Sequence, residues 1–91
     1  MHVKFFATYR KLIGLNEIDV PAPATVWELI TGFADKYGEE VACRMLSENR
    51  DDFGPDLIMM VNGRNVLHIQ GKETPLSEDD LVVIFPVVAG G

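Results

Sequence analysis

Apolar and polar side chains alternate along this chain in short runs, and the runs are separated by turn-forming residues. Such alternation is typical of strands that bury one face. It predicts five strands, at about residues 3–8, 16–20, 57–61, 65–69 and 81–85. Residues 9–14, between the first two strands, are expected to form one helical turn or a loop closed by Gly14.

One stretch follows a helical period instead, over about residues 25–37. Thr25 and Glu28 form a capping box, in which each side chain satisfies a free backbone N–H at the start of a helix. A single apolar stripe follows at helical spacing, made of Val26, Leu29, Ile30, Phe33, Ala34 and Tyr37. Gly38 is a plausible stop, and a short second helix is expected at about 39–47.

Turn residues fix how these elements follow one another. Asn62-Gly63 is a strong two-residue hairpin signal, because both positions tolerate a positive φ. Residues 49–56 read as a loop and residues 71–80 as a polar connection. The element order is hairpin, helix, hairpin and final strand. It predicts an α+β domain, in which a mixed sheet of about five strands is covered on one face by the main helix.

Composition narrows the function classes. The 91 residues suit one domain, and the single cysteine, Cys43, excludes an internal disulfide framework. Fourteen acidic residues against eight scattered Lys and Arg give a net charge of −6. Nucleic acids and anionic membranes are therefore not expected as partners, since both attract clustered cations. With no signal-peptide pattern and no apolar run of membrane-spanning length, the expected location is cytoplasmic.

The chain offers no convincing catalytic or metal site of its own. His2 and His68 lie far apart in the sequence, and neither adjoins a nucleophile motif. Cys43 is expected to be a half-buried small residue of the second helix. The aspartates of the 51–56 loop do not have EF-hand spacing. We therefore predict no catalytic residue and no bound metal or cofactor.

The strands are apolar in both phases, so one sheet face carries apolar side chains that the main helix does not cover. We give even weight to a second small core under a loop and to an exposed patch that docks a partner. The candidate patch consists of Phe6, Ile58, Met60, Val82 and Ile84. Met59 and Met60 lie in opposite phases, and the sequence does not say which of them belongs to it.

The last strand runs into Pro86, which lacks the N–H that a sheet ladder needs. We therefore divide the chain into a domain over residues 1–86 and a flexible tail over 87–91. The tail ends in Gly90-Gly91, whose backbone has no Cβ to block a close approach. Such an end suits a carboxylate that threads a narrow slot in another protein. The alternative is a frayed terminus that is small and apolar by chance.

Several motifs in this order resemble the ubiquitin-like β-grasp sulfur carriers, above all the small subunit of molybdopterin synthase (MoaD) and the small archaeal modifier proteins. The resemblance covers essentially the whole chain. Its motifs are the opening strand with residues 9–14, the helix start at 25–30, the hairpin at 61–64, the approach to the last strand at 76–82, Phe85-Pro86, and Gly90-Gly91. The tail departs from the family pattern at Val87 and Ala89, and Asp79 replaces a glycine that is usual there.

The resemblance implies a β-grasp carrier rather than an enzyme. An E1-like enzyme of the MoaB, MoeB or ThiF type would adenylate Gly91, with ATP and Mg²⁺ bound to that enzyme and not to this chain. The product would be a thiocarboxylate that supplies sulfur for molybdopterin through a MoaE-like large subunit. Pro86, Val87, Val88, Ala89 and Gly90 would dock the tail as an extended strand.

Two alternatives stay open. The chain could instead be a ubiquitin-like modifier that is joined to lysines of target proteins through Gly91. It could also be a β-grasp interaction domain whose tail is inert. The sequence alone does not name the final sulfur acceptor.

Overall fold

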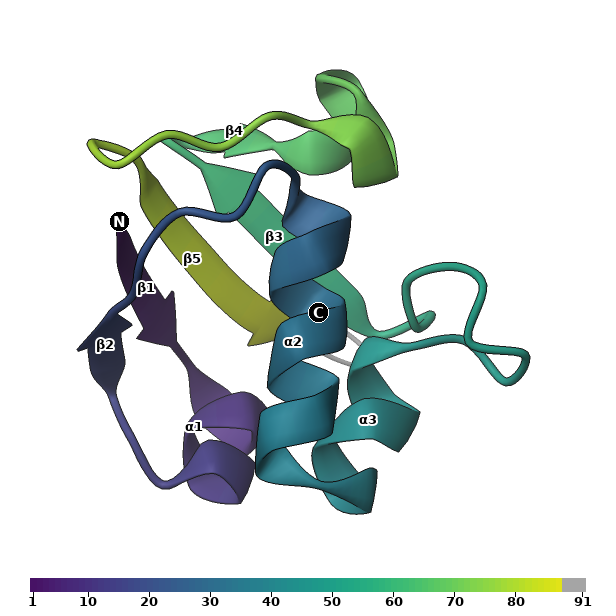
Figure 1. Ribbon diagram of the computed structural model, residues 1–91. Helices are drawn as coiled ribbons and strands as arrows, with labels where there is room; N and C mark the ends of the chain where they lie inside the picture. Colours follow the sequence, from purple (N-terminus) through teal and green to yellow (C-terminus); the bar gives the residue numbers. More distant parts are fainter. Residues whose placement is uncertain (88–91) are drawn as a thin grey trace.

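The computed structural model of the chain describes residues 1–87, which form one sheet with helices on one side (Figure 1). The strands are β1 (His2–Phe5), β2 (Glu17–Asp19), β3 (Leu57–Val61), β4 (Arg64–Asn65) and β5 (Leu81–Pro86). The helices are α1 (Ala7–Ile13), α2 (Val26–Tyr37) and α3 (Glu39–Met45). Two short 3₁₀ turns, Val66–His68 and Gly71–Glu73, lie between β4 and β5.

The strand order is β2-β1-β5-β3-β4, with β1 and β5 parallel at the centre and the other neighbouring pairs antiparallel. The first and last strands therefore lie side by side, and α2 crosses one face of the sheet (Figure 1). This is the β-grasp arrangement of ubiquitin-like proteins. The predicted fold class is confirmed.

The start of α2 follows the capping pattern in the sequence. Thr25 Oγ1 accepts a hydrogen bond from the Glu28 N–H at 3.3 Å. The Glu28 carboxylate in turn accepts the N–H of Ala24, at 2.8 Å, rather than that of Thr25. Two free donors at the helix start are thus satisfied by side chains, which fixes where α2 begins.

The core lies between α2 and the face of the sheet that it covers. Val3, Phe5, Val82 and Ile84 all point to this face and are at most 1% exposed. The Phe5 ring meets Phe33 of α2 edge to face, with ring centroids 5.5 Å apart. Burial of these side chains supplies most of the stability, at about 1.5–3 kcal/mol for each large side chain.

Three local predictions need correction. The return strand predicted for residues 65–69 ends at Asn65, because the Asn65 side chain accepts the Leu67 N–H at 2.9 Å and turns the chain into a 3₁₀ turn. Cys43, expected to be half-buried, is exposed on α3. The first strand, predicted for residues 3–8, ends at Phe5, because residues 7–13 form a full helix, α1, which is followed by Gly14 in the left-handed conformation (φ 84°).

The two tyrosines of the helical layer differ in how their hydroxyls are satisfied. The buried Tyr9 donates to the Arg44 carbonyl at 3.1 Å, and desolvation raises the pKa of Tyr9 to about 12, so it stays neutral. The Tyr37 hydroxyl oxygen is buried without a hydrogen-bond partner among the described residues.

We expect Tyr37→Phe to leave the free energy of unfolding unchanged or to raise it by up to about 1 kcal/mol, because an unsatisfied buried hydroxyl is lost. Tyr9→Phe should instead lower it by about 1 kcal/mol, because it removes a hydrogen bond. Urea denaturation of both variants checks this pair. A Tyr37→Phe variant as unstable as Tyr9→Phe would contradict it.

Candidate functional site: the open sheet face and the base of the tail

The face of the sheet opposite α2 carries a continuous apolar patch. Met60 pairs with Val83, and Ile58 pairs with Phe85, so four apolar side chains form two adjacent rows. These four are half-buried, and the neighbouring Phe6 and Leu81 are 44% and 37% exposed. We call these six residues the open-face patch: Phe6, Ile58, Met60, Leu81, Val83 and Phe85.

The structure corrects two members of the predicted patch. Val82 and Ile84 are fully buried under α2, because they are level with Val3 and Phe5 in the parallel pairing of β1 and β5. Their neighbours Val83 and Phe85 occupy the open face instead. Since residues 81–85 are all apolar, the sequence pattern could not show which of their side chains face α2 and which face the open side. Only the register of the strand pairing shows this.

The other predicted members, Phe6, Ile58 and Met60, do lie outside the core. Phe6 donates its N–H to the Ile84 carbonyl at 3.0 Å and then leads into α1. Met59 is buried at 1% exposure, so Met60 is the methionine of the patch. The open face is therefore apolar over β5 and the adjoining part of β3.

One edge of the open face is charged. His2 of β1 lies opposite Asp19 of β2, with 2.7 Å between Nδ1 and the Asp19 carboxylate. Its Nε2 lies 3.1 Å from the carboxylate of Glu17. The hydrogen bond to Asp19, with smaller contributions from the charges of Asp19 and Glu17, raises the pKa of His2 above its usual 6.5 despite some desolvation.

This cluster predicts a pH-dependent stability. Because the pKa of His2 is raised in the folded state, its contribution is complete below about pH 6.5 and is lost as the pH rises through the raised value. The difference in unfolding free energy between wild type and His2→Gln should therefore be larger at about pH 5.5 than at about pH 9. Chemical denaturation of both proteins at the two pH values tests this. An equal difference at both would contradict it.

The base of the tail is anchored beside the open-face patch. Pro86 pairs with Leu57 and remains within β5, and the Val87 N–H donates to the Asp56 carbonyl at 2.8 Å. Val87 is 50% exposed. The predicted tail residues Val88, Ala89, Gly90 and Gly91 lie outside the described residues. Val87, the last described residue, thus lies two positions after Phe85, which forms one row of the patch with Ile58.

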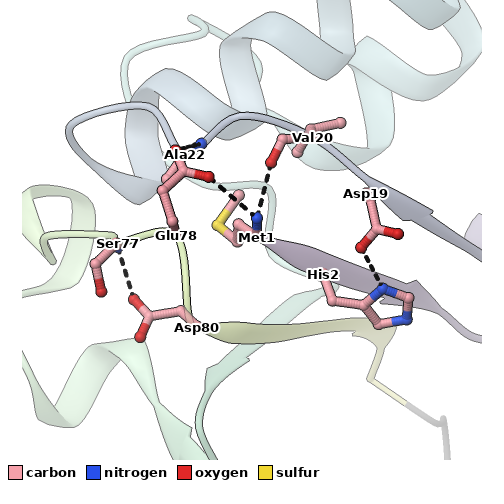
Figure 2. A network of polar contacts seen from close by, with 8 residues as sticks. All are labelled: Met1, His2, Asp19, Val20, Ala22, Ser77, Glu78 and Asp80. Carbon is pink, nitrogen blue, oxygen red and sulfur yellow. Dashed lines mark hydrogen bonds and ion pairs between the residues drawn. The ribbon is translucent and has the colours of Figure 1, made fainter.

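A polar network secures the other end of β5 (Figure 2). The Met1 ammonium donates to the Val20 carbonyl at 3.0 Å and lies 3.4 Å from Glu78, which also accepts the Ala22 N–H. The bond from Ala22 does most to lower the pKa of Glu78. Bonds from Asn62 and then Ser77 lower the pKa of Asp80. These carboxylates hold the turn before β5, as expected of a structural turn.

Nothing else in residues 1–87 assembles into a reactive centre. No group of three or more His, Cys, Asp or Glu side chains in this range is arranged so that it could hold a metal ion. Cys43 donates only to the Glu40 carbonyl of its own helix, at 3.3 Å. None of the described helices combines the length and the apolar character needed to cross a bilayer.

Comparison with known proteins finds one matching family and several similar proteins. The model of the ThiS family matches residues 3–91. Small archaeal modifier protein 3 of Haloferax volcanii is 33% identical over all of this chain and 98% of its own length. A protein of Archaeoglobus fulgidus with the description "putative sulfur carrier protein" is 34% identical over 87% of this chain and 89% of its own.

A solved structure from Pyrococcus furiosus, described as "putative molybdopterin converting factor, subunit 1", is similar throughout. Its sequence is 31% identical, and the match covers 96% of this chain and 95% of the Pyrococcus furiosus chain. The two structures superpose with a TM-score of 0.69.

Proposed function

We propose that this chain, which belongs to the ThiS family, carries sulfur on the carboxylate of its last residue, Gly91. Proteins of this kind are small ubiquitin-like carriers and modifiers rather than enzymes. The observation that carries the proposal is the continuity of the open-face patch with the base of a tail that ends in Gly-Gly.

The chemistry needs nothing from this chain except its carboxylate. An E1-like enzyme would use ATP and Mg²⁺ to form an acyl-adenylate on Gly91, with release of pyrophosphate. Hydrosulfide from a sulfur donor would then attack the acyl carbon, and AMP would leave, so that Gly91 would end in a thiocarboxylate.

The geometry supports a two-part contact with the activating enzyme. Residues 88–91 span at most about 14 Å when extended, so the enzyme's active site would lie close to the base of the tail. The open-face patch adjoins that base and is large enough to orient the domain. Main-chain hydrogen bonds to the tail and apolar contact with the patch would act together.

This arrangement makes the patch testable apart from the tail. Met60→Glu places a charge where a dry apolar contact is expected, so it should lower the rate of activation by about tenfold or more. Leu15→Glu is the control for an added surface charge, since Leu15 is 42% exposed and lies outside the patch. The rate of pyrophosphate release is the readout. Equal rates for both variants would contradict a role for the patch.

We propose molybdopterin synthesis as the destination of the sulfur, through a MoaE-like large subunit. The likeness to the Pyrococcus furiosus structure and the MoaD-like motifs support this choice. The identity to the Haloferax volcanii modifier favours a second function, which is conjugation of Gly91 to lysines. Both functions share the same acyl-adenylate.

The decisive experiment incubates the chain with the E1-like enzyme of its host, ATP, Mg²⁺ and a sulfur donor, and then measures the intact mass. We expect the mass change of one oxygen replaced by sulfur, located at Gly91 by fragmentation. A tagged chain in host extract then separates the two destinations, because only a modifier gives lysine-linked conjugates. If the terminus never gains sulfur, the carrier proposal fails.

A further inference from the structure

One pocket is lined by none of the six residues of the open-face patch, although Leu57 on its wall pairs with Pro86 at the base of the tail. It is a pocket of about 250 Å³ beside β3. Its walls are residues 52–55 of the loop after α3, Leu57 and Met59 of β3, and residues 65–67. The pocket is smaller than the roughly 300–1,000 Å³ of typical small-molecule sites, so it suits one or two side chains better than a cofactor.

Both walls of the pocket are held rigidly. On one side, the Gly54 N–H donates to the Met45 carbonyl at 2.8 Å, and the Phe53 ring packs against Trp27 with centroids 5.8 Å apart. On the other side, Val66 is buried at 2% exposure. A pocket with such walls exists before any ligand arrives, so little ordering cost opposes binding.

An exposed leucine stands on the rim. Leu67 is 69% exposed, more than any other large apolar side chain in residues 1–87. Its backbone is fixed by the bond to the Asn65 side chain. A single exposed leucine is ordinary on a protein surface, but one held at the mouth of an apolar pocket provides contact area for a ligand.

The strand beside the pocket has a partly open edge, where the Leu57 N–H already donates to the Gly54 carbonyl at 3.2 Å. β4 pairs with β3 only at Met60 and Val61. Within the described part of the chain, no strand lies on this side of the segment from Leu57 to Met59. An extended peptide can add to such an edge by main-chain hydrogen bonds while its side chains enter a neighbouring pocket.

Charge indicates the kind of peptide. Asp52 is the only ionisable residue that lines the pocket. One of its carboxylate oxygens accepts the Phe53 N–H at 2.8 Å, so the side chain is held in place. The nearby Lys72 ammonium is already bonded to the Asp51 carbonyl and lies over the Trp27 ring. With a net charge of −6 on the chain, a basic ligand is favoured.

We propose that this pocket and the adjoining edge of β3 bind an extended segment of a partner protein that carries an aliphatic side chain next to arginine or lysine. The aliphatic side chain fills the pocket against Leu67, and the basic side chain pairs with Asp52. The site goes beyond the carrier function, because none of the residues that line it belongs to the open-face patch.

The test titrates ¹⁵N-labelled full-length chain with the capped peptide Arg-Val-Leu-Ile-Arg. We expect saturable shifts of the amides of residues 53–59 and 65–67. Leu67→Ser should weaken binding by about fivefold or more, whereas Leu15→Ser leaves it unchanged. Asp52→Asn should weaken binding of this peptide but not of Gln-Val-Leu-Ile-Gln. Well-dispersed spectra verify that each variant is folded.

Several results would overturn the proposal. They are the absence of saturable shifts, shifts confined to the open-face patch, or equal affinity for the Leu67→Ser variant. Self-association that Leu67→Ser abolishes would mean that a second copy occupies the pocket. Much tighter binding to a chain lacking residues 88–91 would mean that its own terminus does. Activation of Gly91 by the E1-like enzyme, assayed in parallel, should not change in Leu67→Ser. A failure of the pocket proposal can therefore be told apart from a failure of the carrier proposal.

Discussion

Deleting Gly90 and Gly91 is expected to abolish activation of the chain, with a loss of at least about 100-fold in the rate of acyl-adenylate formation. The new terminus, Ala89, carries a Cβ and lies about 7 Å short along an extended tail. Both changes misplace the carboxylate relative to ATP, and a misplacement of even 1 Å can cost about 100-fold. Pyrophosphate release and intact mass are the measurements.

The control for this deletion is the stability of the folded domain. All of the core that the structure describes lies within residues 1–87, so the free energy of unfolding should stay within about 0.5 kcal/mol of wild type. Gly91→Ala keeps the length of the tail but adds a Cβ at its last residue. It therefore separates the effect of a shorter tail from the effect of a bulkier terminal residue. If the deleted chain is activated at the normal rate, Gly90 and Gly91 are not required for activation and this prediction is wrong.

The largest expected effect on stability comes from Gly54→Ala. A Cβ at this buried position would lie 2.3 Å from the carbonyl oxygen of Arg44 and 3.2 Å from that of Leu46. Both are backbone atoms at the end of α3, so no side-chain rotation relieves the clash. Overpacking usually costs about 1–3 kcal/mol, and a backbone clash belongs at the upper end. We expect a loss of about 3 kcal/mol.

Gly32→Ala is the matched control for this substitution. Gly32 lies exposed within α2, and an added Cβ there meets no atom within 4 Å. It should stabilise the protein by about 0.5–1 kcal/mol, because alanine favours the helix. Thermal or urea unfolding of the two variants should therefore move in opposite directions. A Gly54→Ala variant as stable as wild type would contradict the packing argument.

Gly54 and Gly32 show what the sequence alone could not predict. Gly54 stands among turn residues, and its sequence context predicts only a loop. Its requirement comes from the end of α3, which lies only about ten residues earlier in the chain but packs against Gly54 only after folding. A local pattern contains no information about such a contact, because the clash depends on how two elements dock.

Local signals determined much of the rest. The capping residues and the apolar stripe placed α2, and Asn62-Gly63 placed the turn between β3 and β4, where both residues have positive φ. The return strand was predicted too long, because the Asn65 side chain redirects the chain. Short polar contacts of this kind compete with strand pairing and are hard to weigh from composition.

By itself, the sequence determined the α+β class, the main helix and the Gly-Gly terminus on which the proposed chemistry depends. These follow from periodicity, capping and composition, which act between near neighbours in the chain. Only the tertiary structure decided which phase of β5 meets α2, so that Val83 and Phe85 rather than Val82 and Ile84 lie on the open face. The reason is register. A strand that is apolar on both sides fits either way locally, and only its pairing with β1 and β3 fixes which side is buried.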